Sequence, residues 1–227
     1  MIENELKIGI DFSLNSPSIC IKYKKDNNEQ YSFCSFFNSD GKKWKEKDIK
    51  SFKNHKQIYN NNYQDLHIIE YQRKITSDDY TEKESQKIED ANTISKLIVN
   101  YIKQFIVLNN LEIKNIFVAI EGFSFGSKGA SYIDLIMYNS FLRKELAINL
   151  TQPYNIKIFS PKHAKKLTGN GNADKEYMIK SFIENKLQDE LIQKTGLYHY
   201  CKSFLDIKNV KPIDDLVDSY FILKCLD

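Results

Sequence analysis

The sequence is poor in the residues that mark several specialised classes of protein. Only four of its 227 residues are cysteines, and no two of them form a CxxC pair, which argues against a zinc site built from thiolates. No run of residues is long and apolar enough for a secretory or membrane-spanning segment. We therefore expect reduced thiols in a cytoplasmic protein that has no membrane partner.

Glycine and proline are also scarce, at eight and four residues, and no stretch rich in proline, glycine and serine divides the chain. We therefore expect a single domain over residues 1–227. Two insertions are expected within it, one rich in lysine and asparagine near residues 38–82 and one near residues 196–211. The first insertion includes a short predicted strand, Leu66–Tyr71.

The net charge of +3 is too small to indicate a nucleic-acid partner by itself, but lysines gather in two places. Seven lysines surround Trp44 within residues 41–56, and Lys162, Lys165 and Lys166 lie together in the segment SPKHAKK. Each cluster is either a solvated surface or a patch that contacts phosphates. In the first cluster the tryptophan could also stack on a base.

The spacing of apolar residues predicts an α/β fold, because β-prone runs alternate with segments of helical periodicity. Three runs near the N-terminus predict an antiparallel meander. The expected elements are strands near residues 8–11, 17–25 and 30–37, a helix over 82–109, a strand over 115–121, a helix over 130–150, a strand over 154–160, two helices joined by a Gly/Asn turn within 161–187, and an amphipathic helix over 211–227.

Acidic residues occur at the ends of several predicted elements. Asp11 closes the first strand and Glu121 closes the strand that follows the long helix. If these two strands lie side by side, their ends bring two carboxylates into one crevice. In the last helix Asp215 and Asp218 are three residues apart and share one side, while apolar residues share another. Asp214 is a reserve candidate.

A cluster of such acids would need a counter-charge, because like charges ~4 Å apart repel by about 4 kcal/mol at an effective dielectric constant of ~20. Hard oxygen ligands select Mg²⁺ or Mn²⁺. Two ions about 3.5–4 Å apart would activate water and stabilise the leaving oxygen of a phosphodiester, which is the chemistry of a hydrolytic nuclease. The opposing interpretation is that each acid only caps a helix or interacts with a helix dipole.

Four segments resemble the RuvC-type Holliday junction resolvases of the ribonuclease H-like superfamily. They are IGIDFS, VAIEGFSF, SPKHAKKLTGNGNADKEYM and DDLVDSY, in the order and places that this family uses. The resemblance implies an α/β, ribonuclease H-like fold, in which a five-stranded mixed β-sheet is flanked by α-helices. It also implies a Mg²⁺-dependent crossover junction endodeoxyribonuclease with two ions per active site, for which Mn²⁺ would substitute.

The same resemblance implies a partner and a setting. The partner would be branched DNA, above all the four-way Holliday junction, and the protein would act in DNA recombination and repair as a homodimer. It would lie in the bacterial cytoplasm or, if it is a phage or viral protein, in the host cytoplasm.

Residue roles follow from the resemblance by matching positions. Lys175 of NADK would be the basic catalytic residue near the scissile phosphate, and Phe123 or Phe125 would stack on an unpaired base. The catalytic, metal-binding acids would be Asp11, Glu121, Asp215 and Asp218. Further DNA contacts are expected from Lys128, Lys162, Lys165 and Lys166.

Two alternatives remain open at this stage. The same metal site could act on RNA–DNA hybrids or flaps instead of junctions. Alternatively, the chain could be a non-catalytic DNA-binding module on the same fold. The loop GFSFGSKG is similarly ambiguous, because it could cradle a phosphate or be an ordinary connection between a strand and a helix.

Overall fold

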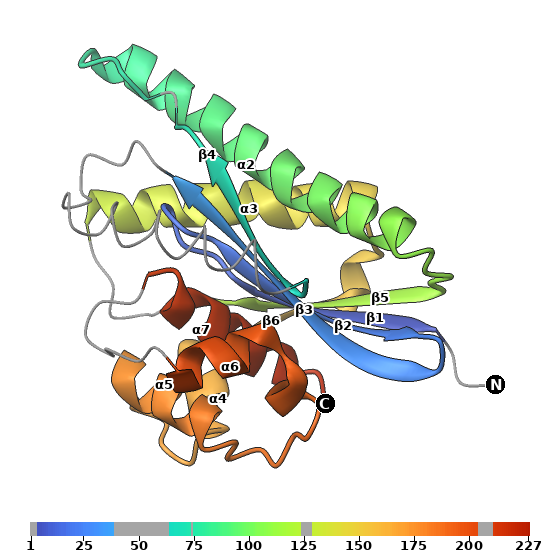
Figure 1. The fold of residues 1–227 in the computed structure, drawn as a ribbon. Coiled ribbons are helices and arrows are strands. Elements are labelled where there is room, and N and C mark those ends of the chain that lie inside the picture. Colours follow the sequence, from blue (N-terminus) through green and yellow to red (C-terminus); the bar gives the residue numbers. More distant parts are fainter. Residues whose placement is uncertain (1–3, 39–63, 74, 124–128, 204–210) are drawn as a thin grey trace.

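The protein is built around one mixed β-sheet that lies between two layers of helices (Figure 1). The computed structural model describes residues 4–38, 64–73, 75–123, 129–203 and 211–227. The lysine cluster around Trp44 lies outside these residues. None of the helices in the described part of the chain has the length and apolar character needed to cross a membrane.

The sheet has six strands in the order β4-β3-β2-β1-β5-β6. The strands are β1 (Glu5–Asp11), β2 (Ser18–Lys25), β3 (Asn28–Asn38), β4 (Leu66–Tyr71), β5 (Asn115–Glu121) and β6 (Ile156–Phe159). The first three form the predicted antiparallel meander, whereas β5 runs parallel to β1 and β6 runs parallel to β5. The α/β class and the mixed sheet flanked by helices are therefore confirmed.

The predicted number of five strands is wrong by one, because β4 joins the sheet at its edge. It pairs in parallel with the second half of β3, where Phe33 lies opposite Leu66. Leu66 and Ile68 are buried, so pairing lets this short run hide its apolar side chains beneath a helical layer. The strand itself was expected from its sequence, but its pairing partner was not.

The helices divide between the two faces of the sheet (Figure 1). They are α2 (Tyr80–Leu108), α3 (Ala130–Asn149), α4 (Pro161–Lys166), α5 (Lys175–Ile183), α6 (Gly196–Ser203) and α7 (Ile213–Lys224), with short 3₁₀ turns η1 (Pro153–Asn155) and η2 (Ile192–Lys194). One face carries α2 and α3, which pack on each other, and the other carries α4 to α7. The bounds of α2 and α3 agree with the predicted helices to within about two residues, the usual uncertainty of helix ends. Helices α5 and α7 end three to four residues earlier than expected, and α6 was not expected, because its segment was taken as an insertion.

Each sheet face has its own apolar core, because successive side chains of a strand point to opposite faces. Ile8 and Ile10 of β1 belong to the core under α2 and α3. Ala119 of β5 and Phe33 of β3 belong to the core under α4 to α7. Strand β5 is thus buried on both sides over Val118–Ile120, which explains its nearly continuous apolar run NIFVAIE.

Helix α7 lies directly against β1, and Gly9 makes this approach possible. A Cβ atom at Gly9 would lie 2.2 Å from the Ser219 carbonyl oxygen and 2.4 Å from the Leu223 amide nitrogen. No side chain fits at such distances, so only glycine allows the helix backbone to touch the strand. This contact places the first turns of α7 beside the carboxyl end of β1.

Candidate metal centre

The two acids that end strands lie at the same edge of the sheet. In the parallel pairing of β1 and β5, Ile10 lies opposite Ile120, and Asp11 and Glu121 follow these two residues directly. Neighbouring strands are about 4.8 Å apart, so the two acids leave the sheet side by side. The predicted convergence of these strand ends is confirmed.

Both acids face the layer that contains α7. Asp11 is two residues beyond Gly9, whose Cα faces the backbone of α7. Glu121 is two residues beyond Ala119, which belongs to the core beneath α7. Residues two apart in a strand share a face, so the strand acids and the acids of α7 meet in one place.

The first turns of α7 bring three further acids to this place. Asp214 and Asp215 are buried, with exposed fractions of 6% and 2%, and Asp218 is half-buried. No side chain caps the N-terminus of α7 through a hydrogen bond, so Asp214 and Asp215 do not act as capping residues. The interpretation of these acids as helix caps therefore does not hold for α7, whereas Asp214 and Asp215 do lie in the first turn, where acids interact favourably with the helix dipole.

The pKa values show that these carboxylates act on one another. Burial and then the charges of Asp215, Glu121 and Asp218 raise the pKa of Asp11 well above its usual range. Burial raises the pKa of Asp218 to about 7, and the charge of Asp215 contributes next. The pKa of Glu121 is raised mainly by burial, against the opposing charge of Lys165. Carboxylates that perturb one another in this way form one electrostatic cluster.

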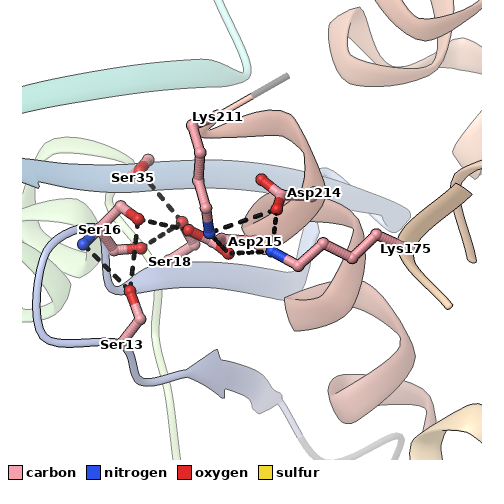
Figure 2. A network of polar contacts seen from close by, with 8 residues as sticks. All are labelled: Ser13, Ser16, Ser18, Ser35, Lys175, Lys211, Asp214 and Asp215. Carbon is pink, nitrogen blue, oxygen red and sulfur yellow. Dashed lines mark hydrogen bonds and ion pairs between the residues drawn. The ribbon is translucent and has the colours of Figure 1, made fainter. Parts of the chain in front are cut away.

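Two lysines neutralise part of the cluster, as Figure 2 shows. The Lys175 ammonium, at the start of α5, donates a hydrogen bond to Asp214 Oδ2 and lies 3.9 Å from Asp215 Oδ1. The Lys211 ammonium donates to Asp215 Oδ1 and lies 3.3 Å from Asp214 Oδ2. Lys175 thus lies beside two acids of the cluster, and its side chain is 61% exposed. Its role near a scissile phosphate stays a prediction.

A serine from the turn between β1 and β2 completes the contacts of Asp215. The Ser16 hydroxyl donates to Asp215 Oδ2, and the Ser16 amide in turn donates to Ser13 Oγ at 3.0 Å. Behind this turn, Ser18 donates to Ser35 Oγ at 3.0 Å (Figure 2). Both carboxylate oxygens of Asp215 are therefore engaged by groups of the chain itself.

The donor chemistry of the cluster fits a divalent cation. All of its acids offer hard oxygen ligands, and within the described part of the chain the buried Oδ1 atom of Asp214 has no hydrogen-bond partner. Among the described residues, no three His, Cys, Asp or Glu side chains already form a metal cage. Lys211 and Ser16 each donate to one oxygen of Asp215. Metal ions would be held by Asp11, Glu121, Asp215 and Asp218 if these side chains turned toward one another.

The residues predicted to contact DNA are only partly described. Phe123 lies just after Glu121, where the Arg143 guanidinium of α3 stacks on its ring at 5.0 Å and Tyr132 meets it edge-on. Phe125 and Lys128 lie outside the described residues. In α4 Lys162 and Lys166 are exposed and Lys165 is half-buried, with its charge acting on Glu121. Their roles in DNA binding stay predictions.

Three contributors to the site were not expected from the sequence. Lys211 is four residues before Asp215, a spacing that pairs opposite charges on a helix, and this signal could have been used. Ser16 and Arg143 carry no comparable signal, since each reaches its partner from a distant part of the chain. A single serine in a turn gives no indication of a contact 199 residues away.

Comparison with known proteins gives matches among solved structures only. No family model matches the chain, and no curated protein matches it. RuvC from Thermus thermophilus has 10% sequence identity and a TM-score of 0.44, with 97% of this chain and 96% of that chain covered. The yeast mitochondrial Holliday junction resolvase Ydc2 has 16% identity and a TM-score of 0.44, with 97% and 76% covered. Over 97% of its length the chain is thus similar to the solved structures of these two proteins.

Proposed function

We propose that the chain is a metal-dependent endonuclease that hydrolyses phosphodiester bonds in branched DNA, with the four-way junction as its substrate. The observation that carries the proposal is the meeting of Asp11, Glu121, Asp215 and Asp218 at one edge of the sheet. These acids come from two strands and a helix, and buried like charges are costly unless a ligand compensates them.

The chain would divide the work of hydrolysis among its own residues. Bound Mg²⁺ or Mn²⁺ would supply activation of water and stabilisation of the charge on the leaving oxygen. The four acids would hold and orient the metal sites, and burial of Asp11 and Asp215 would keep bulk water from competing for them. The exposed Lys175 ammonium lies beside the acids and would attract the phosphate that is to be cleaved.

Substrate contacts beyond the reacting phosphate would come from the neighbouring elements. Phe123 lies two residues after Glu121 and offers a ring for stacking on an unpaired base. The lysines of α4 would contact the DNA backbone, and Lys165 acts electrostatically on Glu121, which places it near the acids. This arrangement favours a distorted or unpaired DNA segment over a regular duplex.

A cleavage panel tests the proposal. Four-way junction, flap, RNA–DNA hybrid and linear duplex would be incubated with the wild-type protein, with and without Mg²⁺ or Mn²⁺. We expect cleavage of the junction only when metal is present. Asp11→Asn and Glu121→Gln should each reduce the rate at least about a hundredfold, because each removes an ion ligand, while junction binding persists.

The matched control is Asp78→Asn, which neutralises an exposed acid of the loop before α2 and should cleave like the wild type. Absence of cleavage of every branched substrate with either metal would refute the proposal. Preferential cleavage of the hybrid would instead assign the site to RNA–DNA hybrids and refute the junction as substrate. Calorimetry that detects no metal binding would favour the non-catalytic alternative.

A further inference from the structure

Lys211 occupies an unusual position for a residue beside a metal centre. Its ammonium group contacts Asp215 and also lies 3.3 Å from Asp214 Oδ2. The side chain is only 31% exposed, and that of Asp215 is 3% exposed, so the pair is largely withdrawn from water. An ion pair in such surroundings is screened far less than one on the surface.

The same oxygens would be needed for a metal ion. Asp215 accepts from Lys211 through Oδ1 and from Ser16 through Oδ2, so each oxygen already holds one hydrogen-bond donor and keeps a lone pair for a cation. A divalent ion bound to Asp215 and the Lys211 ammonium group beside it would repel each other at this distance. Binding of an ion to Asp215 therefore favours movement of the ammonium group away from this carboxylate.

The carboxylate of Asp214 lies beside the Lys211 ammonium group and can accept it when it leaves Asp215. Asp214 Oδ2 is already within 3.3 Å of Lys211, and the buried Oδ1 atom of Asp214 accepts no hydrogen bond from any residue that the structure describes. The move from one carboxylate to the next is short and keeps the lysine paired. Asp214 also holds Lys175, so this acid serves as an anchor for lysines rather than as a metal ligand.

We propose that Lys211 is an internal counter-cation that occupies Asp215 in the metal-free protein and passes to Asp214 when a divalent ion binds. The inference rests on the proposed function, since it takes the acids as the metal site. Lys211 would then stabilise the metal-free cluster and set the ion concentration at which the site fills. It is a positioning residue and does not contact the reacting atoms.

Metal binding measured without DNA tests this role. Mn²⁺ and Mg²⁺ would each be titrated into the metal-free wild type, Lys211→Met and Lys211→Gln in a calorimeter. Loss of a competing charge next to Asp215 should tighten binding by about tenfold or more in both variants. Lys211→Gln retains a hydrogen-bond donor, so it covers the case in which Lys211→Met does not fold.

Two further lysine variants separate displacement from a general change in charge. Lys175→Met removes a neighbouring charge that need not leave Asp215, and Lys96→Met removes an exposed charge on α2. We expect Lys175→Met to tighten binding by less than Lys211→Met, and Lys96→Met to leave it unchanged. Equal effects of Lys175→Met and Lys211→Met would overturn the proposal.

Thermal unfolding provides a second readout. Metal-free Lys211→Met should unfold at a lower temperature than the wild type, because Asp215 loses its counter-charge, and saturating Mn²⁺ should close the gap. Tight metal binding by the wild type with no gain in the Lys211 variants would overturn this inference but leave the proposed function intact. Absence of metal binding by the wild type and by both variants would overturn both.

Discussion

At the scale of single residues, Asp215 is the point on which the candidate site depends. It lies in the first turn of α7 with an exposed fraction of 2%, and it contacts a lysine and a serine while Asp11, Glu121 and Asp218 lie around it. Burial and then the charge of Asp214 raise its pKa. Such a residue is stable only because the chain supplies positive charge nearby, which is also what a metal ion would supply.

The acid cluster predicts how stability depends on pH. The carboxyl of Asp218 has a pKa of about 7 in the folded protein against 3.8 in the unfolded chain, so the folded state binds a proton that the unfolded chain releases. The metal-free protein should therefore lose stability as the pH rises from about 4 to about 7, by roughly a few kcal/mol at most. Urea denaturation at a series of pH values measures this.

Two comparisons make the pH prediction specific. Asp218→Asn should lose less stability than the wild type as the pH rises, because the variant has no proton to lose at this position. Saturating Mg²⁺ should reverse it, since metal ligation requires deprotonated carboxylates and becomes stronger as the pH rises. A metal-free wild type that gains stability between pH 4 and pH 7 would contradict the prediction.

At the scale of elements, the contact of α7 with β1 positions the acids. Gly9→Ala would place a methyl group within about 2.2–2.6 Å of α7 atoms, two of which belong to its backbone, so the helix would have to move. We expect a loss of about 3 kcal/mol in the free energy of unfolding, at the upper end for overpacked cores. Metal affinity should fall as well, because Asp215 and Asp218 move with the helix.

Gly171→Ala is the matched control for Gly9→Ala. Its Cβ would meet the flexible side chain of Lys166 at 3.2 Å, which can give way at little cost. Denaturation of both variants in parallel should show a large loss of stability for Gly9→Ala and only a small change for Gly171→Ala. Similar stabilities of the two variants would mean that α7 tolerates displacement from β1.

The other helical layer is tied to the sheet by a buried polar clamp of Arg73, Asp90 and Tyr138. The Arg73 guanidinium donates to Asp90 at 2.8 Å and to the Tyr138 hydroxyl at 2.6 Å, and that hydroxyl donates to Asp90 at 2.7 Å. These residues come from the segment after β4, from α2 and from α3. The clamp therefore links three elements through groups that have few other partners in the core.

Loss of the Arg73 charge should lower the free energy of unfolding more than loss of the Tyr138 hydroxyl. Arg73→Met leaves the Asp90 carboxylate buried without a counter-charge, so we expect a loss of about 3–5 kcal/mol in the free energy of unfolding. Tyr138→Phe removes hydrogen bonds but no charge and should cost about 1–2 kcal/mol. Chemical denaturation measures both, and equal losses would show that the charge pair contributes little.

At the scale of the whole molecule, the described residues of one chain bring together one acid cluster, formed by Asp11, Glu121 and the acids of α7. A four-way junction is resolved by two cuts, so two copies related by a twofold axis would supply the two sites. We therefore expect a homodimer, with twice the chain mass of 26.6 kDa, in light scattering at micromolar concentration. A single-chain mass combined with junction cleavage would contradict this expectation.

Much of the fold was predictable because its signals are local. The long apolar stripe of α2, the strand-end acids Asp11 and Glu121, and the DxxD spacing of Asp215 and Asp218 all appear within a few residues of sequence. The cap of α5 by Asp174, whose side chain accepts a hydrogen bond from the Tyr177 amide, is also local. Such patterns depend on backbone periodicity, which does not require knowledge of distant contacts.

The acids and the elements that carry them were thus determined by the sequence alone, since residue type and spacing set which strand ends and which helix turn bear a carboxylate. Only the tertiary structure decided the pairing of β4, the close approach of α7 to Gly9, and the contacts of Lys211 and Ser16 with Asp215. The physical reason is that these contacts join residues whose separation along the chain carries no periodic signal. Lys211 belongs to both groups. Its spacing from Asp215 can be found in the sequence, whereas its place among the other acids depends on the fold.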